Sequence, residues 1–106
     1  MMDDRPFVVE RVEPGRFRLS GELDIGTVPR LGQAVADDGP VRGDLVLDLR
    51  DLTFIDSTGV RGLISLADGL DPEGVVVLAA PGPTIARVFD LMGLARHPRL
   101  RVEAAS

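Results

Sequence analysis

The sequence predicts an α/β protein, a small domain in which helices pack on a mostly parallel β-sheet of four to five strands. Two observations support this fold class. Short apolar or alternating segments, typical of strands, occur in turn with segments whose apolar residues recur every three to four positions, as on one face of a helix. After the first two strands a helix separates each strand from the next, and such connections produce parallel strands with right-handed crossovers.

The first two strands are predicted at residues 7–12 and 16–20 and form an antiparallel hairpin. In the second strand Phe17 and Leu19 alternate with polar side chains, which is typical of a strand with one buried face. A proline-glycine pair between the strands supplies the turn. The chain therefore enters the sheet through a hairpin.

A first helix is predicted to begin near Thr27, whose hydroxyl can cap it. Pro29 falls in the first turn, where the backbone N–H that proline lacks would have no helical partner. The apolar stripe of this helix consists of Val28, Leu31 and Val35. Residues 37–40, with the sequence DDGP, then end the helix.

The middle of the chain predicts a strand, a turn and a helix in close succession. Residues 45–49 are apolar except for Asp48, as in a parallel strand that is covered on both faces. The helical face that follows consists of Val60, Leu63, Ile64 and Ala67. Between them, residues 56–59 have the sequence DSTG. Ser, Thr and Asp are the side chains that cap helices by accepting a hydrogen bond from an unpaired backbone N–H.

The last third of the chain repeats the pattern of strand and helix. Residues 71–74 predict a turn, and the unbroken apolar run at 75–80 predicts a buried parallel strand. A Gly-Pro pair at residues 82–83 opens a helix. Its core stripe consists of Ile85, Val88, Phe89 and Met92. Gly93 suits the left-handed residue that ends a helix, and a short last strand is predicted at residues 100–102.

Length and composition limit the class of protein. The 106 residues suffice for one domain, residues 1–106 with a core at about 7–102, that folds without a metal or a disulfide, and cysteine is absent. The sequence shows no targeting segment, and no apolar run approaches the ~20 residues of a membrane span. We therefore expect a cytoplasmic protein without membrane insertion. The formal net charge of −5 has the wrong sign for direct binding to nucleic acid.

The sequence offers few side chains for catalysis or cofactor binding. It has no thiol and no glycine-rich phosphate-binding motif, and its one histidine, His97, lies in a predicted loop and is expected to be solvated. We therefore predict no metal, no cofactor and no enzymatic activity. A serine hydrolase with Ser57 as nucleophile is the weakest alternative, because no G-x-S-x-G elbow surrounds this serine.

Three segments resemble the STAS domains of the anti-sigma-factor antagonist family. Residues 54–59, FIDSTG, resemble the family's phosphorylation segment, with threonine where the family often has a second serine. Residues 20–24, SGELD, resemble a family segment that precedes a helix, and residues 85–94, IARVFDLMGL, are similar to the last main helix. Together the similar segments extend over nearly the whole chain, from Phe7 to Val102.

The resemblance implies a function and a site. It implies that the unphosphorylated protein binds an anti-sigma factor that is also a serine-protein kinase. Phosphorylation of Ser57, with Thr58 as the alternate acceptor, then ends the complex and so regulates sigma-factor-dependent transcription. The implied partner-binding residues are Asp24, Asp56, Ser57, Thr58 and Gly59. The alternative is a scaffold or adaptor in a signalling or transport assembly that is not switched at Ser57.

From the residues alone, each of these side chains also has a structural role available. Ser57 and Asp24 can cap the helices that follow them, and Asp56 gains ~0.3–1 kcal/mol beside a helix N-terminus. Thr58 suits a cap or a packing position, and Gly59 allows a close approach of the helix. For Ser57, capping and phosphorylation are compatible.

One departure from the family pattern concerns the end of the chain. The family has another helix after the last strand, whereas this sequence ends with EAAS at residues 103–106. We expect one face of the sheet to be partly uncovered and to expose apolar residues. The protein is therefore expected to be a monomer or a weak homodimer.

Overall fold

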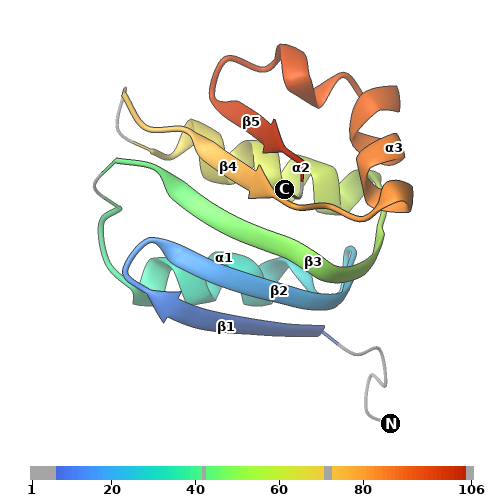
Figure 1. Cartoon of the computed structure of the whole chain (residues 1–106). Coiled ribbons are helices and arrows are strands. Elements are labelled where there is room, and N and C mark those ends of the chain that lie inside the picture. Colours follow the sequence, from blue (N-terminus) through green and yellow to red (C-terminus); the bar gives the residue numbers. More distant parts are fainter. Residues whose placement is uncertain (1–6, 42, 71–72, 105–106) are drawn as a thin grey trace, which may run out of the picture.

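The computed structural model describes residues 7–41, 43–70 and 73–104, so the turn predicted at residues 71–74 lies partly outside the described residues. These residues form a five-stranded sheet with the order β1-β2-β3-β4-β5 (Figure 1). The strands are β1 (Phe7–Glu13), β2 (Arg16–Leu23), β3 (Leu45–Ile55), β4 (Val76–Ala79) and β5 (Leu100–Glu103). β1 and β2 pair antiparallel, and all other neighbours pair parallel. The predicted α/β class with an N-terminal hairpin and a mostly parallel sheet is confirmed.

Helices connect the parallel strands and pack along the sheet. They are α1 (Val28–Asp37), α2 (Ser57–Asp68) and α3 (Pro83–Leu91), followed by a 3₁₀ helix, η1 (Leu94–Arg96). In Figure 1, α1 and α2 lie behind the sheet, and α3 stands at the end where β3 finishes. Among the described residues, no helix has both the length and the apolar character needed to cross a bilayer.

The core lies between the sheet and the helices. On β3, Leu45, Leu47 and Leu49 are fully buried, and each burial of this kind contributes about 1.5–3 kcal/mol. Val60 and Leu63 of the predicted α2 stripe are fully buried as well. Both sets of residues belong to one continuous hydrophobic cluster, so the periodicity of the sequence correctly predicted that these side chains lie in the core.

The opposite face of the sheet carries polar side chains and, in Figure 1, no helix. Asp48 lies there 3.8 Å from Arg18, which in turn lies 3.7 Å from Glu10. The prediction that residues 45–49 are covered on both faces is wrong, because Val46 and Asp48 are only half-buried. Their neighbours in the strand face the helices, so the strand has one dry face and one partly solvated face.

The edge strand β1 brings two apolar side chains to this polar face. Val8 is 57% exposed and Val12 is 50% exposed, and the two flank Glu10 along the strand. Apolar side chains on an exposed edge favour self-association. Weak dimer formation stays a prediction, which sedimentation velocity up to high micromolar concentration would test.

β2 and β3 are longer than predicted, and their shared extension positions the candidate site. β2 continues to Leu23 and β3 continues to Ile55, and these two residues are a matched pair in the parallel ladder. Shifts of register between the two strands interrupt the two-residue alternation of side chains. For this reason the sequence in this stretch shows no clear strand period.

The C-terminal third agrees with prediction except at the end of α3. Ile85 and Phe89 are buried as predicted, but Met92 is 45% exposed, so its assignment to the core stripe is wrong. The helix ends before Met92, and Gly93 adopts the predicted left-handed conformation with a φ of 69°. This turn redirects the chain so that Leu94 enters the core instead.

Candidate functional site

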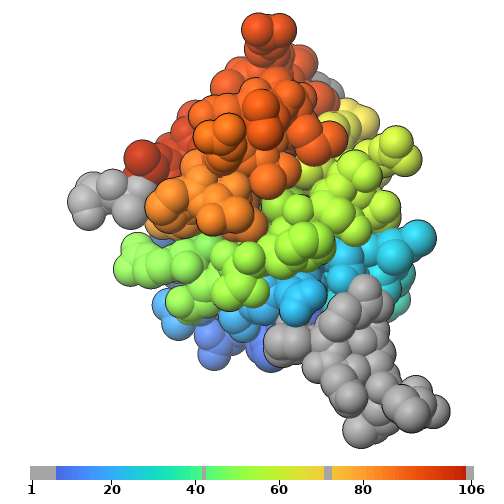
Figure 2. Space-filling view, turned by 90° about the vertical axis from the view of Figure 1, so that its right-hand side faces the viewer, coloured from blue at the N-terminus to red at the C-terminus, as the bar shows by residue number. Residues whose placement is uncertain are grey.

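The carboxyl ends of β2 and β3 bring the two motif-bearing segments together. Because Leu23 and Ile55 are paired in parallel strands, the next residues, Asp24 and Asp56, leave the sheet side by side. A backbone hydrogen bond of 3.4 Å from the Asp56 N–H to the Leu23 carbonyl joins the two exits. Figure 2 faces the edge of the sheet that these strand ends form, where residues after β2 (light blue) and at the start of α2 (yellow-green) share one surface. Loops at this end of parallel sheets commonly form binding sites.

Asp56 caps α2. Its backbone is extended, and its Oδ1 accepts a hydrogen bond of 2.8 Å from the Gly59 N–H. Its carbonyl accepts the first helical hydrogen bond, 3.0 Å long, from Val60. A side-chain cap of this kind contributes about 1 kcal/mol. Of the Ser, Thr and Asp side chains that could cap this helix, the Asp56 carboxylate has this role and the Ser57 hydroxyl does not.

Ser57 is the first residue of α2, and its side chain is exposed. Within the described part of the chain its hydroxyl makes no hydrogen bond. The first backbone N–H groups of a helix have no intrahelical partner, and the helix dipole is positive at this end. The position therefore leaves the Ser57 oxygen accessible and is compatible with an added negative charge.

Gly59 allows α2 to start directly against the end of β2. It is buried, and a Cβ at this position would overlap the carbonyl oxygen of Leu23 and lie 2.7 Å from Cγ1 of Ile55. The close-approach role predicted for Gly59 is confirmed. Thr58 is half-buried and, among the described residues, makes no hydrogen bond through its side chain. Of the two adjacent hydroxyls, that of Ser57 is the more accessible.

Asp24 lies in a polar turn between β2 and α1. It is 3% exposed, and its Oδ1 accepts a hydrogen bond of 2.9 Å from the Gly26 N–H. The fully buried Thr27 hydroxyl accepts a hydrogen bond of 2.9 Å from the Asp24 N–H and donates one of 2.7 Å to the Glu22 carbonyl. Thr27 occupies the N-cap position of α1 as predicted, but its hydroxyl makes no capping hydrogen bond because it is used inside the turn. The Asp24 carboxylate is therefore buried within the turn that it stabilises.

Two large apolar side chains at this edge were not identified from the sequence. Ile25, at the tip of the turn, is 70% exposed, and Phe54, the next-to-last residue of β3, is 46% exposed. Ile25 belongs to neither the strand period nor the helix period, and this is the sequence signal that would have identified it. Arg61, one helical turn after Ser57, is exposed and makes no ion pair with another described residue.

The only histidine of the sequence lies at the other end of α2. His97 was expected to be solvated, but it is half-buried: its Nδ1 accepts a hydrogen bond of 3.1 Å from the Arg99 N–H, and its Nε2 lies 3.6 Å from Asp68. Asp68 is the last residue of α2, roughly 16 Å along the helix from Ser57. A Ser-His pair therefore does not form at Ser57.

Among the described residues, no cluster of His, Asp and Glu side chains is arranged to hold a metal ion.

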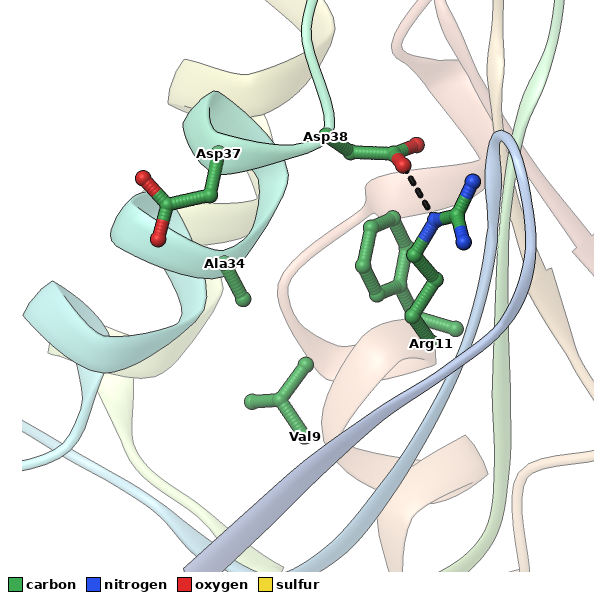
Figure 3. Close-up of a pocket in the computed structure, with 6 residues that line it drawn as sticks. Val9, Arg11, Ala34, Asp37 and Asp38 are labelled. Carbon is green, nitrogen blue, oxygen red and sulfur yellow. Dashed lines mark hydrogen bonds and ion pairs between the residues drawn. The ribbon is translucent and has the colours of Figure 1, made fainter.

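A pocket lies between the hairpin and α1, away from Ser57. It has a volume of about 490 Å³ and is lined by Val9, Arg11, Phe17, Ala34, Asp37 and Asp38. Figure 3 shows Asp38 turned toward Arg11, with which it forms an ion pair, whereas Asp37 points away. A hydrogen bond of 3.0 Å from the Gly15 N–H, aided by Arg11 and opposed by burial, lowers the pKa of Asp38 below its ordinary value. These bonds fasten the hairpin turn to the end of α1.

The sheet order and the paired motif segments define a STAS domain. The model of the family described as STAS domain matches residues 7–105, so the chain belongs to this family. The chain is similar to an anti-sigma factor antagonist from Mycobacterium paratuberculosis, with 32% identity, a TM-score of 0.68, and coverage of 91% of this chain and 84% of that chain. It also shares the fold of the anti-sigma factor antagonist SpoIIAA in its unphosphorylated form, with 24% identity, a TM-score of 0.71, and coverage of 95% and 90%. The family resemblance drawn from the sequence motifs is confirmed.

Proposed function

We propose that the protein is a cytoplasmic anti-sigma-factor antagonist. In its unphosphorylated form it binds an anti-sigma factor that is a serine-protein kinase, here called the partner kinase, and phosphorylation of Ser57 releases it. The observation that carries this proposal is the exposed Ser57 hydroxyl, which lies at the first residue of α2 and makes no hydrogen bond with any residue that the structure describes. The two similar solved structures are both named as anti-sigma factor antagonists, which supports this function.

The chemistry is divided between the two proteins. The partner kinase binds ATP and removes the proton from Ser57, the serine oxygen attacks the γ-phosphorus, and ADP leaves. This chain supplies the acceptor hydroxyl, whose position at the N-terminus of α2 is compatible with the resulting phosphate. Arg61 lies one turn further along the helix and carries the opposite charge, so the phosphorylated domain is expected to remain folded.

Release follows from the place where the charge appears. Phosphorylation adds ~−1.5 to −2 charges beside Asp56, in a chain with a formal net charge of −5. In the complex the phosphate must lose its bound water and contact a kinase surface that fits the neutral hydroxyl of the unphosphorylated protein. A loss of ~3 to 4 kcal/mol, which is modest for an uncompensated buried charge, weakens binding roughly a hundred- to a thousandfold. No conformational change of the domain is required.

The other residues of the proposed site have distinct roles. Asp56 fixes the first turn of α2, and Gly59 allows the helix to pack against β2, so that both determine where Ser57 is presented. Asp24 stabilises the neighbouring turn, and Thr58 is the alternate phosphate acceptor. We propose that the partner kinase covers Ser57 and the surface around it, at the carboxyl ends of β2 and β3, which these residues hold in place.

The proposal is tested by binding and phosphorylation with purified candidate partner kinases. Wild-type protein is incubated with kinase and ATP, and mass spectrometry is expected to show one added phosphate on the peptide that contains Ser57. Ser57→Ala should bind the kinase and resist release by ATP, whereas Ser57→Asp should bind poorly while remaining folded. Thr58→Ala is the matched control and should be phosphorylated and released like the wild type.

Each of the other outcomes has a definite meaning. If Ser57→Ala still takes up phosphate and dissociates, Thr58 replaces Ser57 as the switch. If an active partner kinase binds the protein but phosphorylates neither residue, the switched antagonist is wrong and the scaffold function replaces it. Binding is therefore measured separately from phosphorylation, by calorimetry in the absence of ATP.

A further inference from the structure

The turn between β2 and α1 presents one apolar side chain that contributes little to folding. Hydrogen bonds within the turn join Glu22, Asp24, Gly26, Thr27 and Val28. Ile25 takes part in none of these bonds, and it is 70% exposed at the tip of the turn. Its neighbours therefore hold it in place while its side chain remains in water. Because the turn already orders the backbone of this residue, binding through its side chain costs little backbone conformational entropy. An exposed apolar side chain held in this way suits an interface.

Phe54 provides a second exposed apolar side chain at the same edge. It pairs with Glu22 in the parallel ladder, one residue before the matched ends of β2 and β3. β4 ends at Ala79, opposite Asp48, so this part of β3 extends beyond its β4 neighbour. Phe54 is 46% exposed, whereas the next residue, Ile55, is buried.

Ile25 and Phe54 lie close to Ser57, so a protein that reaches Ser57 is expected to cover them. Ser57 follows Phe54 by three residues, and the segment after β2, which contains Ile25, lies next to the start of α2 (Figure 2). A protein that phosphorylates Ser57 must place its own surface over this edge to reach the hydroxyl. The same surface then covers Ile25 and Phe54.

We propose that Ile25 and Phe54 are the apolar anchors by which the protein binds the partner kinase. This inference rests on the proposed function. The matching surface of the kinase is an apolar depression beside its catalytic site. Aromatic and aliphatic side chains that are buried at the centre of an interface carry much of the binding energy. The anchors also exclude water from the space around Ser57, which makes a phosphate there more costly to accommodate.

The test compares Ile25→Ala and Phe54→Ala with Val12→Ala. Val12 is a matched control because it is 50% exposed but lies beside the hairpin turn, at the opposite edge of the sheet. Each variant is titrated into the purified partner kinase without ATP. Loss of a buried side chain of this size is expected to raise the Kd roughly ten- to a hundredfold for Ile25→Ala, and Val12→Ala should bind like the wild type.

Two further measurements separate docking from folding and from chemistry. Ile25 is mostly exposed, so Ile25→Ala and Ile25→Gln should keep the melting temperature of the wild type, and both should bind weakly. Phosphorylation of Ile25→Ala at saturating kinase should reach the wild-type rate, with only the apparent KM raised. A lowered maximal rate with unchanged KM would show instead that Ile25 acts on the chemical step.

The outcomes distinguish this inference from the proposed function. If the kinase binds and phosphorylates the wild type, and Ile25→Ala and Phe54→Ala bind as tightly, the anchors are wrong while the antagonist function stands. If no serine-kinase anti-sigma factor binds or phosphorylates the wild type, the proposed function fails and the inference fails with it.

Discussion

The turns after β2 and β3 begin alike and continue differently. The matched residues Leu23 and Ile55 are each followed by an aspartate, Asp24 in one turn and Asp56 in the other. Asp24 is almost fully buried and stabilises a turn, after which α1 begins four residues later. Asp56 is half-buried and caps α2, which begins at the next residue. The same side chain at the same position of the sheet thus supports two local structures.

The difference between the two turns explains why the Ser57 hydroxyl is exposed. In the first turn Thr27 is fully buried, and its hydroxyl both accepts and donates hydrogen bonds. In the second turn the Asp56 carboxylate satisfies the N–H that a hydroxyl would otherwise cap, so the Ser57 hydroxyl stays in solvent. One turn uses its hydroxyl for stability, and the other leaves it available for modification.

The largest expected effect on stability comes from the contact between the two turns. Gly59→Ala places a methyl group against the backbone carbonyl of Leu23, which is part of a strand and cannot move aside. We expect the free energy of unfolding to fall by about 3 kcal/mol, at the upper end of the range for overpacking. Urea denaturation measures this change.

The control for this variant is Gly32→Ala on α1. No atom lies within 4 Å of the Cβ that this substitution adds. Alanine is the better helix former, so this variant is expected to gain up to about 1 kcal/mol. Equal losses in the two variants would contradict the close contact at Gly59.

The second prediction concerns the buried hydroxyl. Thr27→Val keeps the shape of the side chain but leaves the Asp24 N–H without its hydroxyl acceptor and the Glu22 carbonyl without its donor. Leaving such groups unsatisfied costs about 2 kcal/mol, which chemical denaturation would show. The companion variant Thr27→Ser retains the hydroxyl and should recover most of the loss. If Thr27→Val is as stable as the wild type, the turn is not held by this residue.

These contrasts show which features local sequence patterns predict and which they do not. The hairpin and the buried stripe of α2 were predicted because each depends on a regular spacing of side chains. The ends of β2 and β3 were missed because shifts of register between the two strands remove the alternation. The burial of Asp24 depends on that pairing, so no local pattern in SGELD distinguishes it from an exposed residue.

The site was predicted in its residues but not in its geometry. The motifs FIDSTG and SGELD were recognised by resemblance, and in a parallel sheet the segments that follow the strands lie at the same edge. Which residue caps α2 depends on where the helix begins, and helix boundaries are the least certain feature of a sequence pattern. Ser57 and Asp56 are both good caps, and only the position of the first turn decides between them.

The third prediction tests the cap itself. Asp56→Ala removes the acceptor of the Gly59 N–H and is expected to lower the free energy of unfolding by about 1 kcal/mol. Asp56→Asn keeps a capping oxygen and should be close to the wild type. A loss of equal size in both variants would mean that the charge beside the helix N-terminus matters more than the hydrogen bond. High salt should then reduce the difference in stability between the wild type and both variants.

A third aspartate, at the opposite edge of the sheet, supplies a test that depends on pH. The pKa of Asp38 is lowered chiefly by the hydrogen bond from Gly15 and further by Arg11, so the folded state favours the carboxylate. Its contribution to stability is fully present above its ordinary pKa of 3.8 and is lost as the pH falls toward the lower folded pKa. Denaturation of the wild type and of Asp38→Asn between about pH 3 and pH 5 should therefore give curves that converge toward the acid end.

The smallest expected effect is the one that most sharpens the comparison of the two turns. Ser57→Ala removes a hydroxyl that makes no hydrogen bond within the described part of the chain, from an exposed side chain, and leaves the Asp56 cap intact. The free energy of unfolding should therefore stay within about 0.5 kcal/mol of the wild type, in contrast to the larger loss in Thr27→Val. A substantial loss in Ser57→Ala would show that this hydroxyl also stabilises the fold. Phosphorylation would then have to break a stabilising interaction, and the domain would change its stability as well as its charge when Ser57 is modified.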